Sequence, residues 1–218
     1  MNEVSIRVFE AFAGYGSQSL ACKEFEKKQN QFKFEVVGIS EIDEDSVKAY
    51  NILHGNDIKN ENDITEIDWH KVPDFNLFFY TFPCQDISWT GLKKGFDENS
   101  DTRSSLLWQC KKAIEIKKPK YLIMENVKSI TYKNKPNNGE RSNKENLGLW
   151  IKYLEEMGYK STKMIMNASD YGIPQHRERY ILISVLGKDE LKMSHRKRQT
   201  PVVETVLERN VSSKYYLK

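Results

Sequence analysis

The sequence is poor in cysteine, and its cysteines form no pair of the kind that binds zinc or builds a disulfide framework. Cys22, Cys84 and Cys110 are widely spaced, and their number is odd. Structural zinc sites use short C-x-x-C spacings and disulfide scaffolds use paired cysteines, so the sequence favours neither. The four histidines are scattered as well, and we expect no metal site.

Long apolar runs and a strong excess of one charge are also missing. No segment is apolar for long enough to span a bilayer, and the N-terminus carries acidic Glu3 and no apolar signal core. We therefore expect a cytoplasmic protein without a membrane partner. The 34 basic and 31 acidic residues leave a net charge of +3. Such a small excess neither requires nor excludes a nucleic-acid partner, because local clustering of charge decides binding.

Apolar runs that alternate with amphipathic stretches are present along most of the chain. The 218 residues are enough for one domain with a full core, and the alternation predicts a doubly wound α/β domain with a mostly parallel sheet. Two polar stretches, 86–102 and 133–146, are predicted to be a mobile loop and a linker. The expected strands are Val4–Phe9, Phe34–Ile39, Phe75–Tyr80, Lys120–Met124, Lys160–Met166 and Arg179–Val185, and the expected helices are Ser17–Lys28, Glu44–Leu53, Ser104–Lys117 and Leu147–Met157.

Three signals in the first third of the chain suit a nucleoside ligand. The segment 12–16 places Gly14 and Gly16 at the end of the first strand, where a tight turn brings backbone close to a ligand. Glu41 ends the second strand, where a carboxylate can accept hydrogen bonds from ribose hydroxyls. Asp63 follows in a turn-like sequence. Each signal alone has an ordinary explanation as a turn or a solvated acid, but their order favours a nucleoside cofactor.

The most specific signal is Cys84, in the sequence Phe82-Pro83-Cys84-Gln85 directly after the third apolar run. Many buried cysteines are inert. This cysteine, however, follows a proline at a strand end, where an α/β sheet presents its ligand site.

The order of several motifs resembles the DNA cytosine-5 methyltransferase family of bacterial restriction–modification systems, specifically its N-terminal catalytic portion. The Pro-Cys-Gln sequence is followed by Arg103 and Leu106, by Glu125-Asn126-Val127 after the next strand, and by a long block at 167–179. The resemblance covers nearly the whole chain. It implies a Rossmann-like class I S-adenosylmethionine-dependent methyltransferase fold, with a mostly parallel twisted sheet, helices on both faces and an antiparallel last strand. It further implies that residues 1–190 form the catalytic domain. Residues 191–218 are then expected to be a linker toward a target-recognition region that is absent from this chain.

The resemblance also implies a cofactor, S-adenosylmethionine, which becomes S-adenosylhomocysteine, and a set of residues that hold it. By this comparison Phe12 packs on the adenine with Ile42 as a further apolar wall, Glu41 binds the ribose, and Asp63 contacts the adenine amino group. The full set of expected cofactor-binding residues is Phe12, Ala13, Gly14, Gly16, Glu41, Ile42, Asp63, Ile64, Pro83 and Leu106.

The catalytic roles that the resemblance implies belong to Cys84, Glu125, Arg177 and Arg179. Cys84 is expected to attack C6 of a cytosine, Glu125 to hold or protonate N3, and the two arginines to bind O2 and orient the catalytic groups. Cytosine C6 is inaccessible within a stacked duplex, so the expected partner is double-stranded DNA with the base flipped out. The loop 86–102 is the expected lid.

Several side chains are candidates for contacts with DNA. Within the lid, Ser88, Trp89, Lys93 and Lys94 are expected to face it, although a surface loop without such a role is an open alternative. The basic run His195-Arg196-Lys197-Arg198 either meets phosphates or forms a solvated linker.

The sequence departs from the family in small details and at its end. Glu10 stands where the family usually has Asp, Ser17 replaces a frequent glycine, and Thr81 replaces a usual glycine. In the family a target-recognition region and two closing motifs follow the block at 167–179, and none appears before Lys218. We therefore hypothesise a shortened chain or the larger half of a split enzyme, with a C-terminal subunit that carries target recognition.

Two alternative functions remain at this stage. One is the tRNA-methylating branch of the same family, whose Cys-Phe-Thr signature is absent. The other is a non-catalytic remnant that binds cofactor or a partner. The presence of Cys84, Glu125, Arg177 and Arg179 argues against such decay.

Overall fold

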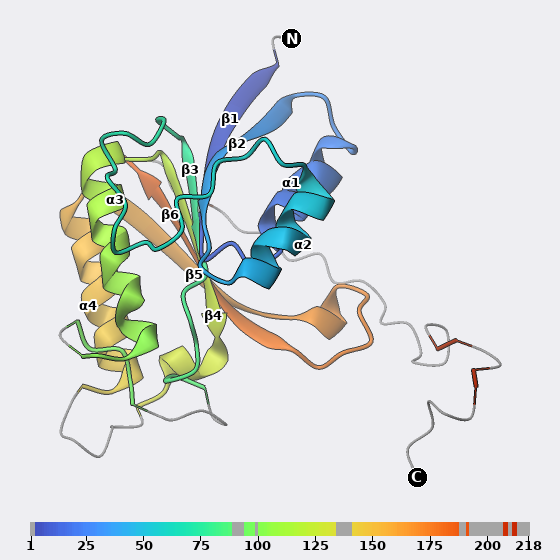
Figure 1. Ribbon diagram of the computed structural model, residues 1–218. Coiled ribbons are helices and arrows are strands. Elements are labelled where there is room, and N and C mark those ends of the chain that lie inside the picture. The colour runs from blue at the N-terminus through green and yellow to red at the C-terminus, as the bar shows by residue number, and fades with distance from the viewer. Residues whose placement is uncertain are drawn as a thin grey trace.

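A computed structural model describes residues 3–88, 94–98, 100–133 and 141–187, together with 191, 207–208 and 211–212. Within these ranges the strands form one six-stranded sheet in the order β2-β1-β3-β4-β6-β5 (Figure 1). β2, β1, β3 and β4 are parallel to one another, whereas β6 is antiparallel to β4 and to β5. The predicted α/β class and the antiparallel last strand are confirmed. The strands are β1 (Val4–Ala11), β2 (Phe32–Ser40), β3 (Leu77–Tyr80), β4 (Tyr121–Val127), β5 (Tyr159–Asn167) and β6 (Glu178–Leu186).

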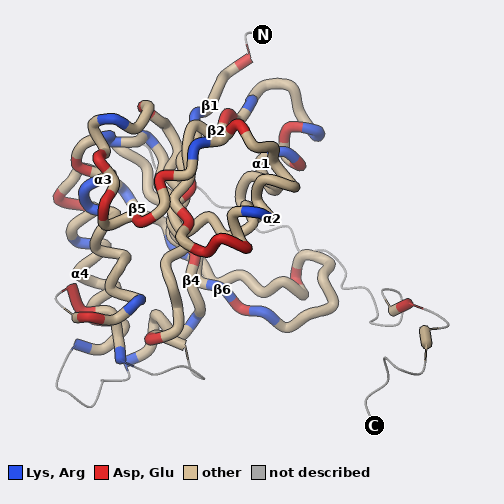
Figure 2. The backbone as a smooth tube through the Cα atoms, viewed as in Figure 1, with Lys and Arg blue, Asp and Glu red and all other residues tan. Residues whose placement is uncertain are grey.

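Helices lie on both sides of this sheet, as predicted. α1 (Ser17–Glu26) and α2 (Glu44–His54) lie on one side, and α3 (Cys110–Lys117) and α4 (Asn143–Glu156) lie on the other (Figure 1). α2 has an acidic first turn that follows its N-cap residue, Asp43, visible as a red stretch in Figure 2. In the described part of the chain, no helix is long and apolar enough to cross a membrane.

Two helix starts differ from the prediction. α4 begins at Asn143, inside the stretch predicted to be a linker, because Ser142 and Glu145 form a capping box that satisfies the first free backbone amides. The helix predicted from Ser104 begins as a 3-10 helix over Arg103–Gln109, and the α-helix starts only at Cys110. Serine hydroxyls that bond to backbone carbonyls compete with α-helical geometry in this segment, as Ser105 does with the carbonyl of Thr102.

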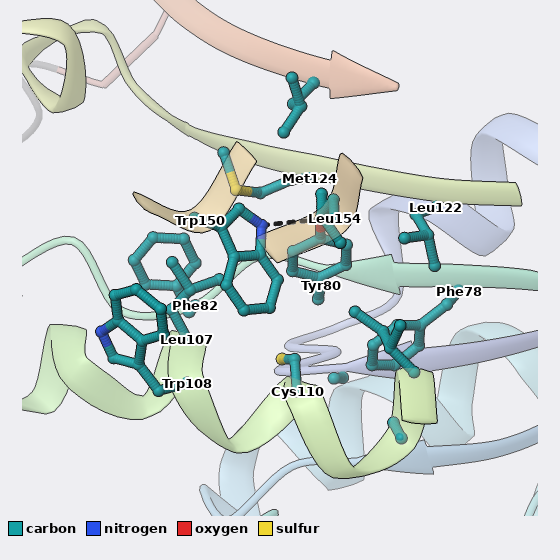
Figure 3. Packing of buried hydrophobic residues seen from close by; sticks show 14 of the residues in the cluster. Phe78, Tyr80, Phe82, Leu107, Trp108, Cys110, Leu122, Met124, Trp150 and Leu154 are labelled. Atoms are coloured by element: carbon teal, nitrogen blue, oxygen red, sulfur yellow. Dashed lines mark hydrogen bonds between the residues drawn. The ribbon is translucent and has the colours of Figure 1, made fainter. Parts of the chain in front are cut away.

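The largest buried cluster lies between the sheet and the α3–α4 side. Trp150 of α4 is fully buried, and its indole N–H donates to the Tyr80 hydroxyl of β3 at 3.3 Å (Figure 3). Its ring also meets Trp108 edge-to-face, with centroids 5.6 Å apart. Because aromatic side chains bury large apolar areas and the polar edge of this one has a partner, Trp150 anchors α4 to the sheet.

The turn between β1 and α1 is shaped by glycine. Gly14 and Gly16 have φ angles of 55° and 81°, a region that favours glycine. A Cβ on Gly16 would lie 2.6 Å from the Tyr50 ring and would also collide with His54, whereas a Cβ on Gly14 would meet open space. α2 therefore packs directly against the backbone of this turn.

Some predicted features fall on residues outside the described ranges. These are Trp89 and Lys93 of the expected lid, the basic run at 195–198, and the expected end of the catalytic domain at 190. Almost all of the linker expected at 191–218 lies outside the described ranges as well. Ser88 and Lys94 lie within the described part of the chain.

Trp150→Ala should lower the free energy of unfolding by about 3–5 kcal/mol, since it leaves a large cavity and removes the partner of Tyr80. Leu149→Ala, at the neighbouring position that is 40% exposed, should stay within about 1 kcal/mol of the native chain. Urea denaturation followed by circular dichroism measures both. Equal losses for the two variants would contradict the anchoring role of Trp150.

Gly16→Ala should destabilise the chain by about 3 kcal/mol, because it combines a left-handed backbone penalty with overpacking against α2. Gly14→Ala has the backbone penalty alone and should lose only about 1–2 kcal/mol. Denaturation of the two variants under identical conditions separates the cost of the left-handed backbone from the cost of overpacking against α2. A larger loss for Gly14→Ala than for Gly16→Ala would exclude close packing at the turn.

Candidate active site

The ends of four strands meet at one edge of the sheet. β1, β3 and β4 are parallel neighbours, so their carboxyl ends point the same way. β6 runs in the opposite direction and therefore begins at this edge, with Arg179 opposite Val127. The segments that follow β1 and β3, the end of β4 and the start of β6 are thereby brought together. This is where ligands bind in open α/β sheets.

A pocket at this edge gathers most of the expected cofactor-binding residues. Beside the expected residues it includes Ser40, Asn62 and Arg103, which were not predicted as cofactor-binding residues. Ser40 and Asn62 precede Glu41 and Asp63 directly, and that adjacency was a signal available in the sequence. The lining residues are Phe12, Ser40, Glu41, Ile42, Asn62, Asp63, Ile64, Pro83, Arg103 and Leu106.

The remaining expected cofactor residues form the turn beside this pocket. Gly14 N–H donates to the Glu41 carboxylate at 2.9 Å, and Ala13 N–H donates to the carbonyl of Ser40 at 3.2 Å. Gly16 is the N-cap of α1. Ala13, Gly14 and Gly16 thus hold the loop against the end of β2 and do not themselves line the pocket.

The chemistry of this pocket fits an adenosine group. Phe12, Ile64 and Leu106 offer apolar surface for a flat base, and the carboxylates of Glu41 and Asp63 offer hydrogen-bond acceptors for hydroxyl and amino groups. One Asp63 oxygen also accepts from the backbone and hydroxyl of Thr65 at 2.8 Å. Asp63 therefore has the turn role that was its ordinary explanation as well as a place in the pocket wall.

Cys84 lies in a tight turn beside the same pocket. Its carbonyl accepts the N–H groups of Ile87 and Ser88 at 3.0 and 2.8 Å. The preceding residue, Pro83, lines the pocket with Phe12 and Glu41, and the Cys84 side chain is partly exposed. The predicted nucleophile is therefore next to the predicted cofactor pocket.

The segment before Cys84 is held by side chains that the sequence analysis did not single out for this role. Asn126 donates its amide N–H to the Phe82 carbonyl at 3.0 Å, and the Ser104 hydroxyl donates to the Pro83 carbonyl at 2.7 Å. Asp86 and Ser104 also bond to each other's backbone N–H at 3.3 and 3.2 Å. Asn126 stood within the Glu-Asn-Val motif, but the partner of its side chain is set only by tertiary structure.

Two of the departures from the family pattern have structural roles. The Thr81 hydroxyl donates to the Phe12 carbonyl at 3.1 Å and so joins the residues that directly follow β3 and β1. Phe12 has a left-handed φ of 57°. Glu10 is almost completely buried and accepts from the Tyr50 hydroxyl at 3.0 Å. Burial raises the pKa of Glu10, and hydrogen bonds from Ser19 and Tyr50 oppose that rise.

Glu125, at the end of β4, is paired with Arg179. The Arg179 Nε lies 2.8 Å from Glu125 Oε1, and the Glu125 side chain is 33% exposed. Burial raises the pKa of Glu125, while the positive charges of Arg179 and Arg177 and the hydrogen bond from Arg179 oppose that rise. The net direction is upward, so the protonated carboxyl persists to a higher pH than an ordinary glutamic acid.

The two expected arginines differ in their positions. Arg179 lies in β6, but Arg177 precedes the strand, is exposed, and has its backbone N–H bonded to the Asn167 side chain at 2.9 Å. Arg177 therefore lies just outside β6, which begins at Glu178. The charge of Arg177 still acts on Glu125. Glu178 in turn pairs with Lys128, both carboxylate oxygens at 2.9 Å from Nζ.

Among the residues that the structure describes, no group of three or more His, Cys, Asp or Glu side chains is arranged to hold a metal ion.

Comparison with solved structures gives the same fold. The Entamoeba histolytica methyltransferase EhMeth matches with a TM-score of 0.76 over 99% of this chain and 64% of its own, at 21% identity. The S. pombe Dnmt2 methyltransferase matches with a TM-score of 0.71 over 98% of this chain and 62% of its own, at 17% identity.

Comparison with sequences is more specific. The chain is 40% identical to the type II methyltransferase M2.ScrFI of Lactococcus lactis subsp. cremoris, over 98% of this chain and 70% of the relative. It is 28% identical to the orphan methyltransferase M.SssI of Spiroplasma monobiae, over 96% of this chain and 66% of the relative. The chain thus spans about two thirds of the length of these two relatives. Residues 6–217 match the C-5 cytosine-specific DNA methylase family, and the chain belongs to that family, which uses S-adenosylmethionine as its methyl donor.

Proposed function

We propose that this chain is the catalytic part of a DNA (cytosine-5-)-methyltransferase that methylates C5 of a flipped-out cytosine through a covalent bond between Cys84 and C6. The observation that carries the proposal is the position of the Cys84 turn. Pro83 lines the adenosine-type pocket, while Asn126, the residue after Glu125, holds the carbonyl of Phe82. These contacts support a site at which the bound methyl donor, the nucleophile and the acid would meet at one edge of the sheet.

The reaction needs a nucleophile because C5 of cytosine is unreactive while the ring is conjugated. Addition of the Cys84 thiolate to C6 forms a C–S bond and moves electrons toward N3 and C5, so that C5 gains enamine character. C5 would then form its bond to the methyl group as the bond between that methyl group and the donor sulfur breaks, which leaves a neutral thioether. A base then removes the C5 proton, and the bond between Cys84 and C6 breaks to restore the ring and release the thiolate. An ordinary thiol is only a few per cent ionised at neutral pH. The thiol proton of Cys84 must therefore pass to a proton acceptor when the flipped cytosine binds.

Glu125 is proposed as the acid that acts on N3 of cytosine. A protonated carboxyl can donate to N3 and so accept the charge that thiolate addition creates, and its other oxygen can accept from the exocyclic amine. The raised pKa of Glu125 keeps a proton available for this donation. Arg179 holds the carboxyl by its Nε contact and offers N–H donors to the cytosine O2, a role that Arg177 is proposed to share.

S-adenosylmethionine, when bound, supplies a methyl group made electrophilic by its sulfonium charge. The residues of this chain proposed to bind it are those of the pocket, with Phe12, Ile64 and Leu106 against the adenine and Glu41 on the ribose hydroxyls. Asp63 is placed to accept from the adenine amino group. The walls exclude water from the base while the carboxylates fix its orientation.

The proposed macromolecular partner is double-stranded DNA. Type II methyltransferases of restriction–modification systems are among the similar sequences, and reaction at C6 requires the base to leave the stack. We further propose that target recognition needs polypeptide beyond the part of the relatives that this chain spans, either on a longer chain or on a separate C-terminal subunit. The 218-residue chain alone should then show little or no sequence-specific methylation.

A duplex in which every cytosine of one strand is 5-fluorocytosine tests the covalent step without knowledge of the target sequence. With S-adenosylmethionine present, the chain, supplied with a complementing C-terminal portion, should form a denaturant-resistant adduct, because fluorine at C5 cannot be removed as a proton. Cys84→Ser should abolish the adduct, whereas Cys110→Ser, at a fully buried cysteine, should retain it. Mass spectrometry of tryptic peptides identifies the attached residue.

Two other results of this experiment would redirect the proposal. An adduct with tRNA that contains 5-fluorocytosine, and none with DNA, would assign the chain to RNA methylation. Cofactor binding without an adduct on either nucleic acid would leave a binding-only domain.

The pH dependence of adduct formation tests Glu125. The rate for the native chain should fall at high pH as Glu125 loses its proton, and this fall should occur above the range of an ordinary glutamic acid because burial raises its pKa. Glu125→Gln cannot transfer a proton to N3, so it should be slower by about 10²–10⁴-fold and should lack that limb of the profile. An unchanged profile in Glu125→Gln would remove Glu125 from the acid role.

A further inference from the structure

The peptide unit that joins Phe12 to Ala13 is held from both sides by the ends of the strands that flank β1. Its carbonyl, on Phe12, accepts the hydroxyl of Thr81, which directly follows β3, at 3.1 Å. Its N–H, on Ala13, donates to the carbonyl of Ser40, the last residue of β2, at 3.2 Å. Since β1 lies between β2 and β3 in the sheet, the two hydrogen bonds fix the rotation of this peptide unit.

Phe12 needs such a restraint because its backbone is in an unfavourable conformation. Its φ angle of 57° lies in the left-handed region, which residues with a Cβ seldom adopt. A residue keeps such a conformation only when its surroundings impose it. The bond between Ala13 and Ser40 joins two backbone groups, so it does not depend on their side chains. The bond to the Phe12 carbonyl comes from a side chain and therefore depends on the identity of residue 81.

The backbone of Phe12 also decides where its ring lies. The ring is part of the wall of the pocket that is proposed to hold the adenosine group, together with Ile64 and Leu106. A turn of the peptide unit after Phe12 would change its ψ angle, and the ring would then lie in a different direction relative to the loop. Thr81 is not among the lining residues of this pocket, so any effect of its hydroxyl on a ligand there passes through Phe12.

Resting on the proposed function, we infer that Thr81 is a positioning residue that sets the affinity of this chain for S-adenosylmethionine, because its hydroxyl keeps the Phe12 ring in place against the adenine. Without the hydroxyl, the strained loop populates other conformations, and the apparent affinity falls in proportion to the fraction that remains competent to bind. Glycine, which the family usually has at this position, offers no such bond. The restraint is therefore a feature of this chain and of relatives with a hydroxyl at this position.

The affinity for S-adenosylhomocysteine, titrated into the 218-residue chain by calorimetry, tests the inference without methyl transfer. Thr81→Val keeps the shape of the side chain and loses the hydroxyl, so it should raise the Kd by about 2- to 12-fold. Thr81→Ser keeps the hydroxyl and should bind like the native chain. Thr131→Val is the matched control, since it loses a hydroxyl bond to the Lys128 carbonyl at 2.9 Å that lies outside the pocket. Its Kd should be unchanged.

A second set of variants tests whether Thr81 acts through Phe12. Phe12→Ala removes the ring and should by itself weaken the binding of S-adenosylhomocysteine. Thr81→Val added to Phe12→Ala should then raise the Kd no further, because the group that the hydroxyl positions is gone. An effect of Thr81 that does not pass through the ring would instead add the same loss in both backgrounds.

Thermal denaturation of each variant identifies a temperature at which all of them are folded, and the titrations are made there. If Thr81→Val does not fold, Thr81→Ala replaces it with the same expected result. An unchanged Kd in the folded variant, an equal loss in Thr81→Ser, or an undiminished effect in the Phe12→Ala background would overturn the inference and leave the pocket in place. Absence of binding by the native chain would overturn both. Adduct formation at Cys84 is a separate measurement, so failure of the covalent mechanism is recognised independently.

Discussion

The hydrogen bonds from Asn126 and Ser104 to the carbonyls of Phe82 and Pro83 are the contacts on which the site depends. A cysteine at a strand end has many conformations open to its loop, and these two bonds tie the loop to the end of β4 and to the 3-10 segment that precedes α3. The turn that follows is closed on the Cys84 carbonyl by two backbone N–H groups. The proposed nucleophile, the proposed acid and the pocket wall are thereby tied to one another, as a preorganised site would require.

The electrostatics of the site follow from its place at the sheet edge. Glu125 is close enough to the core for burial to raise its pKa, yet Arg179 approaches to 2.8 Å and opposes that rise. The net result is a Glu125 carboxyl that keeps its proton to a higher pH than an exposed glutamic acid would. When it is ionised, its negative charge is paired with Arg179. The pKa of Glu10 is also raised by burial. Glu10 is more deeply buried, and hydrogen bonds from the hydroxyl groups of Ser19 and Tyr50 oppose the rise there.

The two sides of the sheet differ in how they are packed in the described part of the chain. The core beneath α3 and α4 is densely aromatic, and the Trp150 ring contacts both Trp108 and Tyr80 (Figure 3). On the opposite side, α1 and α2 are the helices that lie against the sheet within the described ranges (Figure 1).

The sequence by itself determined the order of the elements, the fold class and the family. Apolar runs of strand length and amphipathic segments gave the α/β class, and the Pro-Cys-Gln, Glu-Asn-Val and 167–179 motifs gave the family. It did not locate the start of α4 or the 3-10 segment at Arg103–Gln109, because a capping box and serine hydroxyl bonds act over a few residues and override apolar periodicity. Tertiary structure alone decided that Asn126, Ser104 and Thr81 hold the catalytic turn and the cofactor loop. The partners of these side chains lie between 21 and 69 residues away in sequence, and only the convergence of strand ends at one edge of the sheet brings them within hydrogen-bonding distance.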